Sequence, residues 1–132
     1  CMKRNSYVSE WVEKAEGDFE TVRDLSKKNT KRQRYIIAFH CQQCIEKYLK
    51  ALLTYHKIEF PKQHDLEQLL VLLLEKEPLL LPIRRSLGKL TPFAVNFRYP
   101  GEDIAPKEVR QAINITEQLR VVLRECLGFK KK

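Results

Sequence analysis

The sequence has few residues that favour turns and sheets, and it has no apolar run long enough to span a membrane. Only 4 of its 132 residues are glycine, and no segment alternates apolar and polar residues as a strand would. Both features argue against an all-β fold. The longest apolar run, around 69–74, is far shorter than the ~18 residues of a transmembrane helix. The N-terminal stretch CMKRNSYVSEW also lacks the apolar centre of a signal peptide, so we expect a cytoplasmic protein that does not enter a membrane.

Metal-binding and redox motifs are equally sparse. Cys41 and Cys44 form a single CxxC, and no second pair supplies the remaining ligands of a zinc site. The pair lies in a predicted helix, without the βαβ context of a redox motif. Because free cysteine packs as a small apolar residue, we predict that both side chains belong to the core. We expect neither a metal nor a cofactor.

Basic residues, in contrast, are plentiful. Lys and Arg outnumber Asp and Glu by 25 to 17, which gives a net charge of +8 and a pI near 9.4. This excess favours anionic partners such as nucleic acid, nucleotides or an acidic protein, although it also fits a merely soluble basic surface. The length suits one domain. We expect residues 1–132 to form it, with a core of about 9–127 and a basic tail at 128–132.

Apolar residues recur at helical spacing in several stretches of the chain. The predicted helices are 9–28, 34–55, 66–77 and 106–127, with a short extra helix at 83–90. Asp65 is a predicted N-cap with Gln68 at the third helical position, and Pro106 begins the last helix. The predicted fold is all-α, an up-and-down antiparallel four-helix bundle with one short extra helix.

The stretch FHCQQCIEKYLKALL places several polar residues on a helix that is otherwise apolar. His40, Gln43, Lys47 and Lys50 are spaced three, four and three residues apart, so they share one helix face, while Gln42 and Glu46 share a neighbouring one. For Gln42, Lys47 and Lys50 individually, a solvated face is an adequate explanation. Together, an imidazole, an amide and a cation are also the groups that hold a phosphate and a base edge.

A second polar group lies in the predicted loop, within NFRYP at 96–100. Arg98 carries a planar fork that suits phosphate, and Tyr99 beside it can stack on a base. Alternatively, Arg98 pairs with Glu46 and ties the loop to the bundle. His64 precedes the N-cap Asp65, so we interpret it as a structural residue at the helix entry.

Three segments in this order, FHCQQCIEKYLKALL, KQHDLEQLL and LTPFAVNFRYPGE, resemble the HEPN (higher eukaryotes and prokaryotes nucleotide-binding) domain family. The resemblance runs from Trp11 to Leu127. It implies a bundle of four or five helices that is often a homodimer. Small prokaryotic members often occur beside a minimal nucleotidyltransferase in modules that behave as toxin and antitoxin. Some members bind nucleotides, and many are metal-independent ribonucleases built on Arg, four to six residues, then His.

The chain departs from that ribonuclease motif. No histidine follows any arginine after residue 64, and the only match in spacing is Arg34 with His40. Six residues correspond to about 1.7 helical turns, so these two side chains lie on different faces.

Three hypotheses therefore remain. The first is a homodimeric binding module for a nucleotide or RNA, paired with a nucleotidyltransferase; its predicted contacts are His40, Gln43, Lys47, Arg98 and Tyr99. The second is a ribonuclease toxin in which His40 acts with Arg34 or Arg98. The third is purely structural, with Glu46 and His64 as polar anchors of the fold.

Overall fold

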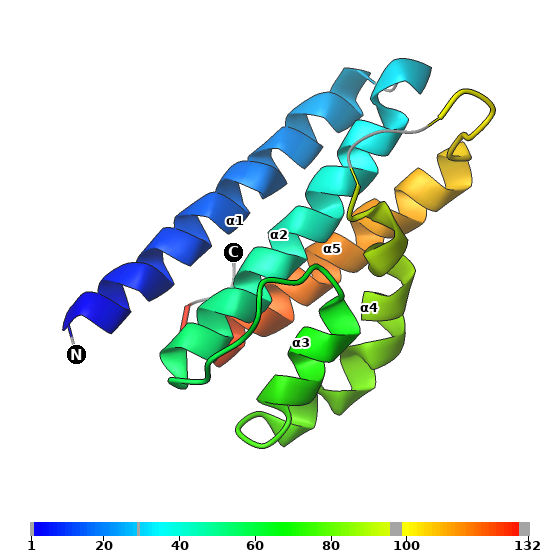
Figure 1. The fold of residues 1–132 in the computed structure, drawn as a ribbon. Coiled ribbons are helices and arrows are strands. Elements are labelled where there is room, and N and C mark those ends of the chain that lie inside the picture. Colours follow the sequence, from blue (N-terminus) through cyan, green and yellow to red (C-terminus); the bar gives the residue numbers. More distant parts are fainter. Residues whose placement is uncertain (1, 29, 96–98, 130–132) are drawn as a thin grey trace.

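Helix α2 (Arg34–Tyr55) is the centre of the molecule, and the other helices pack around it (Figure 1). It lies centrally because its apolar residues cover most of its circumference. Cys41, Cys44, Tyr48 and Leu49 are all fully buried in one continuous core. The predicted bounds of this helix are confirmed.

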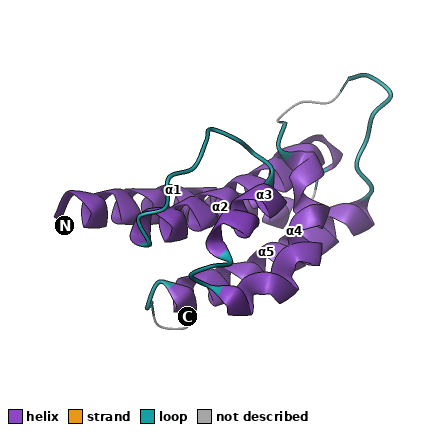
Figure 2. Cartoon of the chain, turned by 60° about the horizontal axis from the view of Figure 1, so that its bottom comes forward, coloured by secondary structure: helices purple, strands orange, loops and turns teal. Residues whose placement is uncertain are grey.

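A computed structural model describes residues 2–28, 30–95 and 99–129, with side chains from residue 5 onward. The remaining α-helices are α1 (Met2–Lys28), α3 (Leu66–Leu73), α4 (Arg84–Leu90) and α5 (Pro106–Cys126). Short 3₁₀ helices occupy Lys31–Gln33, Pro78–Ile83 and Thr91–Phe93. Within these ranges there is no strand (Figure 2). The all-α prediction is confirmed.

Two predicted helix boundaries were wrong. The third helix ends at Leu73 instead of residue 77, and a turn occupies 74–76. A helix could not include residue 77 in any case, because the residue before a proline avoids helical dihedrals. Glu77 precedes Pro78 and has φ −131° and ψ 64°. The chain then continues as a 3₁₀ helix before α4 begins at Arg84. The first helix begins at Met2, seven residues earlier than expected.

The long helices alternate in direction. α1 runs antiparallel to α2, and α4 returns toward the end of the bundle where α2 begins (Figure 1). α5 then runs beside α2 in the same direction. Near the beginnings of the two helices, Arg34 of α2 and Arg110 of α5 line the same pocket. Near their ends, Arg124 of α5 donates a hydrogen bond to the Tyr48 hydroxyl of α2. The up-and-down arrangement is thus confirmed.

The loop between α2 and α3, residues 56–65, folds back along α2. The Phe60 ring lies 6.4 Å from the ring of Trp11 on α1, and the Lys50 ammonium sits over both rings. Further along, the His64 imidazole reaches Glu46, in the middle of α2. Asp65 then accepts hydrogen bonds from the backbone of Glu67 and Gln68, which begins α3 as predicted. The loop therefore covers one polar face of α2.

Candidate functional site

The polar residues of α2 divide between two separate clusters. The first joins α2 to α1, and we call Asp18, His40 and Lys47 the Asp18 cluster. His40 Nδ1 lies 2.8 Å from one carboxylate oxygen of Asp18, and Lys47 Nζ lies 2.5 Å from the other. The side chain of Asp18 is only 10% exposed, whereas those of His40 and Lys47 are 26% and 22% exposed. One nearly buried carboxylate thus holds a partly exposed imidazole and a partly exposed ammonium group at the surface.

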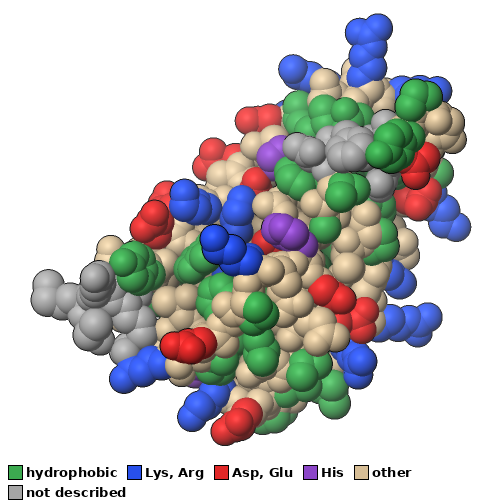
Figure 3. Space-filling view, in the orientation of Figure 1, with side chains coloured by type: hydrophobic (Ala, Val, Ile, Leu, Met, Phe, Trp, Pro, Cys, Tyr) green, Lys and Arg blue, Asp and Glu red, His purple; other side chains and the backbone are tan. Residues whose placement is uncertain are grey.

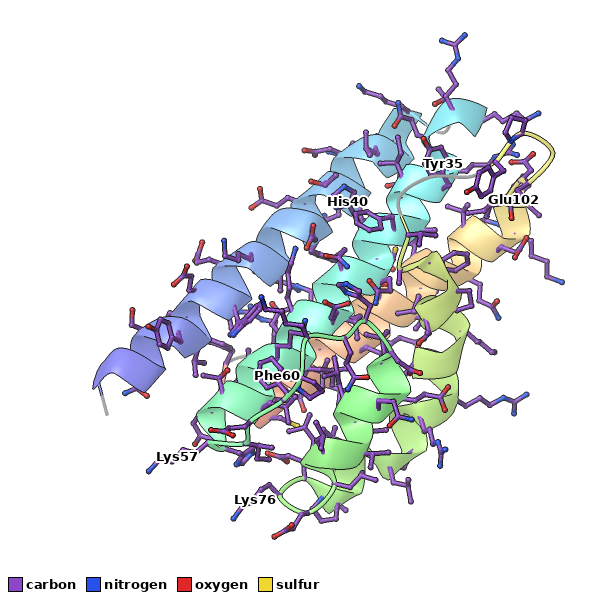
Figure 4. The ribbon with its side chains drawn as sticks, viewed as in Figure 1. Tyr35, His40, Lys57, Phe60, Lys76 and Glu102 are labelled. Atoms are coloured by element: carbon purple, nitrogen blue, oxygen red, sulfur yellow. The ribbon has the colours of Figure 1, made fainter. Side chains whose placement is uncertain are left out.

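This arrangement orients the imidazole. A carboxylate only accepts hydrogen bonds, so His40 donates through Nδ1–H. Its Nε2 atom has no hydrogen-bond partner among the residues described in the structure. Figure 4 shows His40 on the side of α2 that faces α1. Figure 3 shows histidine side chains among basic and acidic side chains on this surface. His40 therefore presents Nε2 as an acceptor when neutral and as a donor when protonated.

The second cluster joins α2 to the loop, and we call Glu46, Gln42, Lys50 and His64 the Glu46 cluster. The Glu46 carboxylate accepts from Lys50 Nζ at 2.9 Å and Gln42 Nε2 at 3.0 Å, and it contacts His64 Nδ1 at 2.9 Å. Burial alone would raise the pKa of Glu46, but the hydrogen bonds from Lys50, Gln42 and His64 outweigh it and hold that pKa below its usual value. Glu46 is thus a buried carboxylate that stays ionised.

The solvated-face interpretation was wrong for two residues of this cluster. Gln42 is fully buried and Lys50 is 8% exposed. Both lie beneath the returning loop, where Gln42 also donates to the backbone carbonyl of His64 at 2.9 Å. Gln43 donates to the Gln42 side chain at 2.8 Å, so it is tied to this cluster and not to His40.

A third group of polar side chains, Glu16, Tyr48, Arg120 and Arg124, ties three helices together. Glu16 on α1 accepts from Arg120 on α5 through two oxygens, at 2.7 and 2.5 Å. The Tyr48 hydroxyl on α2 donates to the same carboxylate and accepts from Arg124 at 3.0 Å. Burial raises the pKa of Tyr48, and its hydrogen bond to Glu16 raises it further. The tyrosine therefore stays protonated and acts as a structural donor.

The structure does not bring Arg34 and His40 together within one chain. Arg34 lines a pocket against α5 that includes Val109 and Arg110. His40 faces α1, as the six-residue spacing requires. A cleft shared by these two side chains would need a second chain.

Of the two contacts predicted in the loop, Tyr99 lies among the described residues and Arg98 does not. Tyr99 lines a hollow of about 580 Å³ with Tyr35, Lys31 and Arg32, at the end of the bundle where α2 begins. Figure 4 shows Tyr35 and Glu102 on facing sides of this region. Arg98 lies outside the described residues, as does its predicted pairing with Glu46.

Asp18 was missed by the sequence reasoning, although the sequence carries a signal for it. It lies three residues after Ala15 and four before Val22, both buried, so helical spacing puts it on the apolar stripe of α1. A carboxylate at such a position needs a partner. The partners came from α2, 22 and 29 residues further along the chain.

The two central cysteines are fully buried. Burial raises the pKa of the Cys41 thiol to about 12 and raises that of Cys44 as well. Because the thiolate is the reactive form, we expect neither to react with Ellman's reagent at pH 8 in the native protein. Cys126 is partly exposed and should react, but slowly, because burial and nearby glutamates raise its pKa too. Mass spectrometry of the labelled peptides identifies the sites. Rapid native labelling of Cys41 would contradict its place in the core; labelling in urea is the control.

The family comparison agrees with this architecture. The model of the family described as HEPN domain matches residues 8–126. The chain belongs to the HEPN domain family. No curated protein and no solved structure matched it. As a HEPN domain, it is a helical module of a nucleotide-binding and ribonuclease-like kind.

The described residues offer neither a membrane span nor a cluster of metal ligands. None of their helices combines the length and the apolar character that crossing a membrane requires. They also contain no group of three or more His, Cys, Asp or Glu side chains arranged to hold a metal ion.

Proposed function

We propose that this HEPN domain binds the phosphate backbone of RNA or a nucleotide at the Asp18 cluster. The observation that carries the proposal is that His40 and Lys47 share one nearly buried carboxylate while both remain partly exposed. When His40 is protonated, the cluster bears two positive charges and one negative, so it attracts an anion. The protein's net charge of +8 favours the same class of ligand.

We propose the hollow beside Tyr99 as the position of a base. Tyr35 and Tyr99 both line it, and Lys31 and Arg32 place cations beside them, while the carboxylates of Glu102 and Asp103 line it as well. Aromatic side chains interleaved with cations are typical of single-stranded nucleic-acid sites. The proposed ligand would thus contact His40 and Lys47 through phosphate, with Tyr99 as the stacking residue. Gln43, predicted as a further contact, donates to Gln42 instead. Arg98, which directly precedes Tyr99 in the sequence, stays part of this proposal.

The assembly follows from the family resemblance. We propose a homodimer of this single domain that associates with a minimal nucleotidyltransferase in a toxin–antitoxin-like module. The exposed apolar residues Val71, Leu79 and Leu81 support an interface on the α3 side, because exposed apolar clusters commonly mark protein contacts.

Replacing Lys47 with glutamine tests the binding site. We expect about tenfold weaker binding of single-stranded RNA, measured by fluorescence anisotropy, because one charged contact is lost. The salt dependence of the binding constant should also fall by about 0.7 in slope. Lys76→Gln is the matched control, since Lys76 is exposed and lies at the other end of the molecule from His40 (Figure 4). Equal affinities for the two variants would overturn the proposed site.

The alternative is a metal-independent ribonuclease that uses His40 with Arg34 or Arg98. The hydrogen bond that His40 donates to Asp18 favours it, because an oriented imidazole whose Nε2 has no partner among the described residues can act as a general base. The separation of Arg34 from His40 favours binding without cleavage. An incubation distinguishes binding from cleavage. The protein is mixed with the single-stranded RNA of the binding experiment in EDTA, and the RNA is analysed on a gel. Cleavage that disappears in His40→Ala would establish the ribonuclease.

A further inference from the structure

A second basic pocket lies where α1 ends and both α2 and α5 begin. Arg34 from α2 and Arg110 from α5 line it, together with the hydroxyl-bearing Ser26 and Thr30. Apolar side chains such as Ile37 and Val109 also line it, and both are buried. Its volume is about 170 Å³. Figure 1 shows these three helix ends at the same end of the bundle.

The charges of this pocket are unbalanced. Its lining contains two arginines and no carboxylate. Elsewhere in the described structure, Arg84, Arg120 and Arg124 each pair with a glutamate. No such pair involves Arg34 or Arg110 among the residues described. The Thr30 side chain also makes no capping hydrogen bond to the 3₁₀ helix that follows it.

We propose that this pocket binds the phosphoryl group of a nucleotide monophosphate or of a terminal phosphate on RNA. Two guanidinium forks from different helices can each donate two hydrogen bonds to phosphate oxygens. The Thr30 hydroxyl offers a further donor, and the apolar residues between the arginines accommodate the sugar. The size of the pocket suits a phosphate with part of its sugar but leaves the base outside.

This site is independent of the Asp18 cluster. Arg34 faces α5, whereas His40, six residues later, contacts Asp18 on α1. α2 therefore separates the two sites, and either one can be wrong without the other. Exposed lysines lie at the end of the bundle that holds this pocket, including Lys27, Lys28 and Lys31. They would steer anions toward the pocket.

Isothermal titration with 5′-AMP tests the proposal. We expect the wild-type protein to bind 5′-AMP, inorganic phosphate to compete, and adenosine, which lacks the phosphate, to fail. Each of Arg34→Gln and Arg110→Gln should weaken 5′-AMP binding about tenfold, the usual effect of losing a charge-assisted hydrogen bond. Arg85→Gln, an exposed arginine on α4, is the matched control. Arg110→Gln should leave the binding of single-stranded RNA without a terminal phosphate unchanged, whereas Lys47→Gln should weaken it, which separates this site from the Asp18 cluster.

A measurement on the unaltered protein guards against misfolded variants. Phenylglyoxal modifies accessible guanidinium groups, and mass spectrometry locates them. We expect 5′-AMP to protect Arg34 and Arg110 while Arg85 continues to react. Absent 5′-AMP binding, equal binding of adenosine, wild-type affinity in both arginine variants, or unprotected Arg34 and Arg110 would each overturn the proposal.

Discussion

Replacing Glu46 with glutamine is expected to lower the free energy of unfolding by about 3 kcal/mol, because a buried cation loses its counter-charge. That cation is Lys50, which is 8% exposed and lies 2.9 Å from the carboxylate. Glutamine keeps the shape of the side chain, so the effect reports charge and hydrogen bonding rather than a cavity. Urea denaturation at pH 7 measures it.

Two further variants make this prediction specific. Glu75→Gln changes the same side chain at an exposed position and should alter stability by less than about 0.5 kcal/mol. The double variant Glu46→Gln, Lys50→Met removes both charges and should recover much of the loss, since apolar replacements of buried pairs are often neutral. A Glu46→Gln protein as stable as Glu75→Gln would show that the pair contributes nothing.

The same carboxylate predicts a pH dependence. The pKa of Glu46 in the folded protein lies below its usual 4.5, so the folded state releases this proton more readily than the unfolded chain. Its contribution is therefore fully present above about pH 4.5 and is lost as the pH falls through the lowered pKa. The wild-type protein should lose stability in this acid range more steeply than Glu46→Gln. Parallel acid profiles would contradict the prediction.

Replacing Glu16 with glutamine is the second change with a large expected effect, also about 3 kcal/mol. It deprives Arg120 of a carboxylate that it contacts through two nitrogens and deprives Arg124 of an ion pair at 3.7 Å. The side chains of both arginines are nearly buried, so water replaces the lost partner poorly. Because Glu16 links α1 to α5, thermal unfolding followed by circular dichroism should show a lower midpoint.

Glu20→Gln is the control for this variant, since Glu20 lies one turn later on α1 and is exposed. A double-mutant cycle with Arg120→Gln isolates the pair from its surroundings. We expect a coupling energy above about 1 kcal/mol, as for residues within one hydrogen-bonded network. Additive effects would show that Glu16 and Arg120 act independently.

The sequence predicted the helices well where the apolar spacing was unambiguous. It placed α2 at its observed bounds, because the steps of three and four through Ile37, Cys41, Cys44 and Tyr48 continue over the whole helix. It misjudged the end of α3, since Leu74 and the charged residues at 75–77 carry no helix-breaking signal before Pro78, although the backbone has already turned.

Helical spacing predicted only part of the candidate site. Helical spacing correctly put His40 and Lys47 on one face, and both meet Asp18. It could not show that Gln43 turns toward the Glu46 cluster, or that Gln42 and Lys50 are buried. Those outcomes depend on the loop at residues 56–65, whose path over α2 has no periodic signature.

The sequence by itself determined that the chain is helical, where its long helices lie and which family it resembles. These properties arise from contacts within a few residues, so a local pattern encodes them. Only the tertiary structure decided which polar side chains meet. Asp18 lies 22 residues from His40, and Glu16 lies 104 from Arg120. Such pairs form because helix packing brings buried charges within reach of one another, and the low polarity of the core then makes each partner necessary.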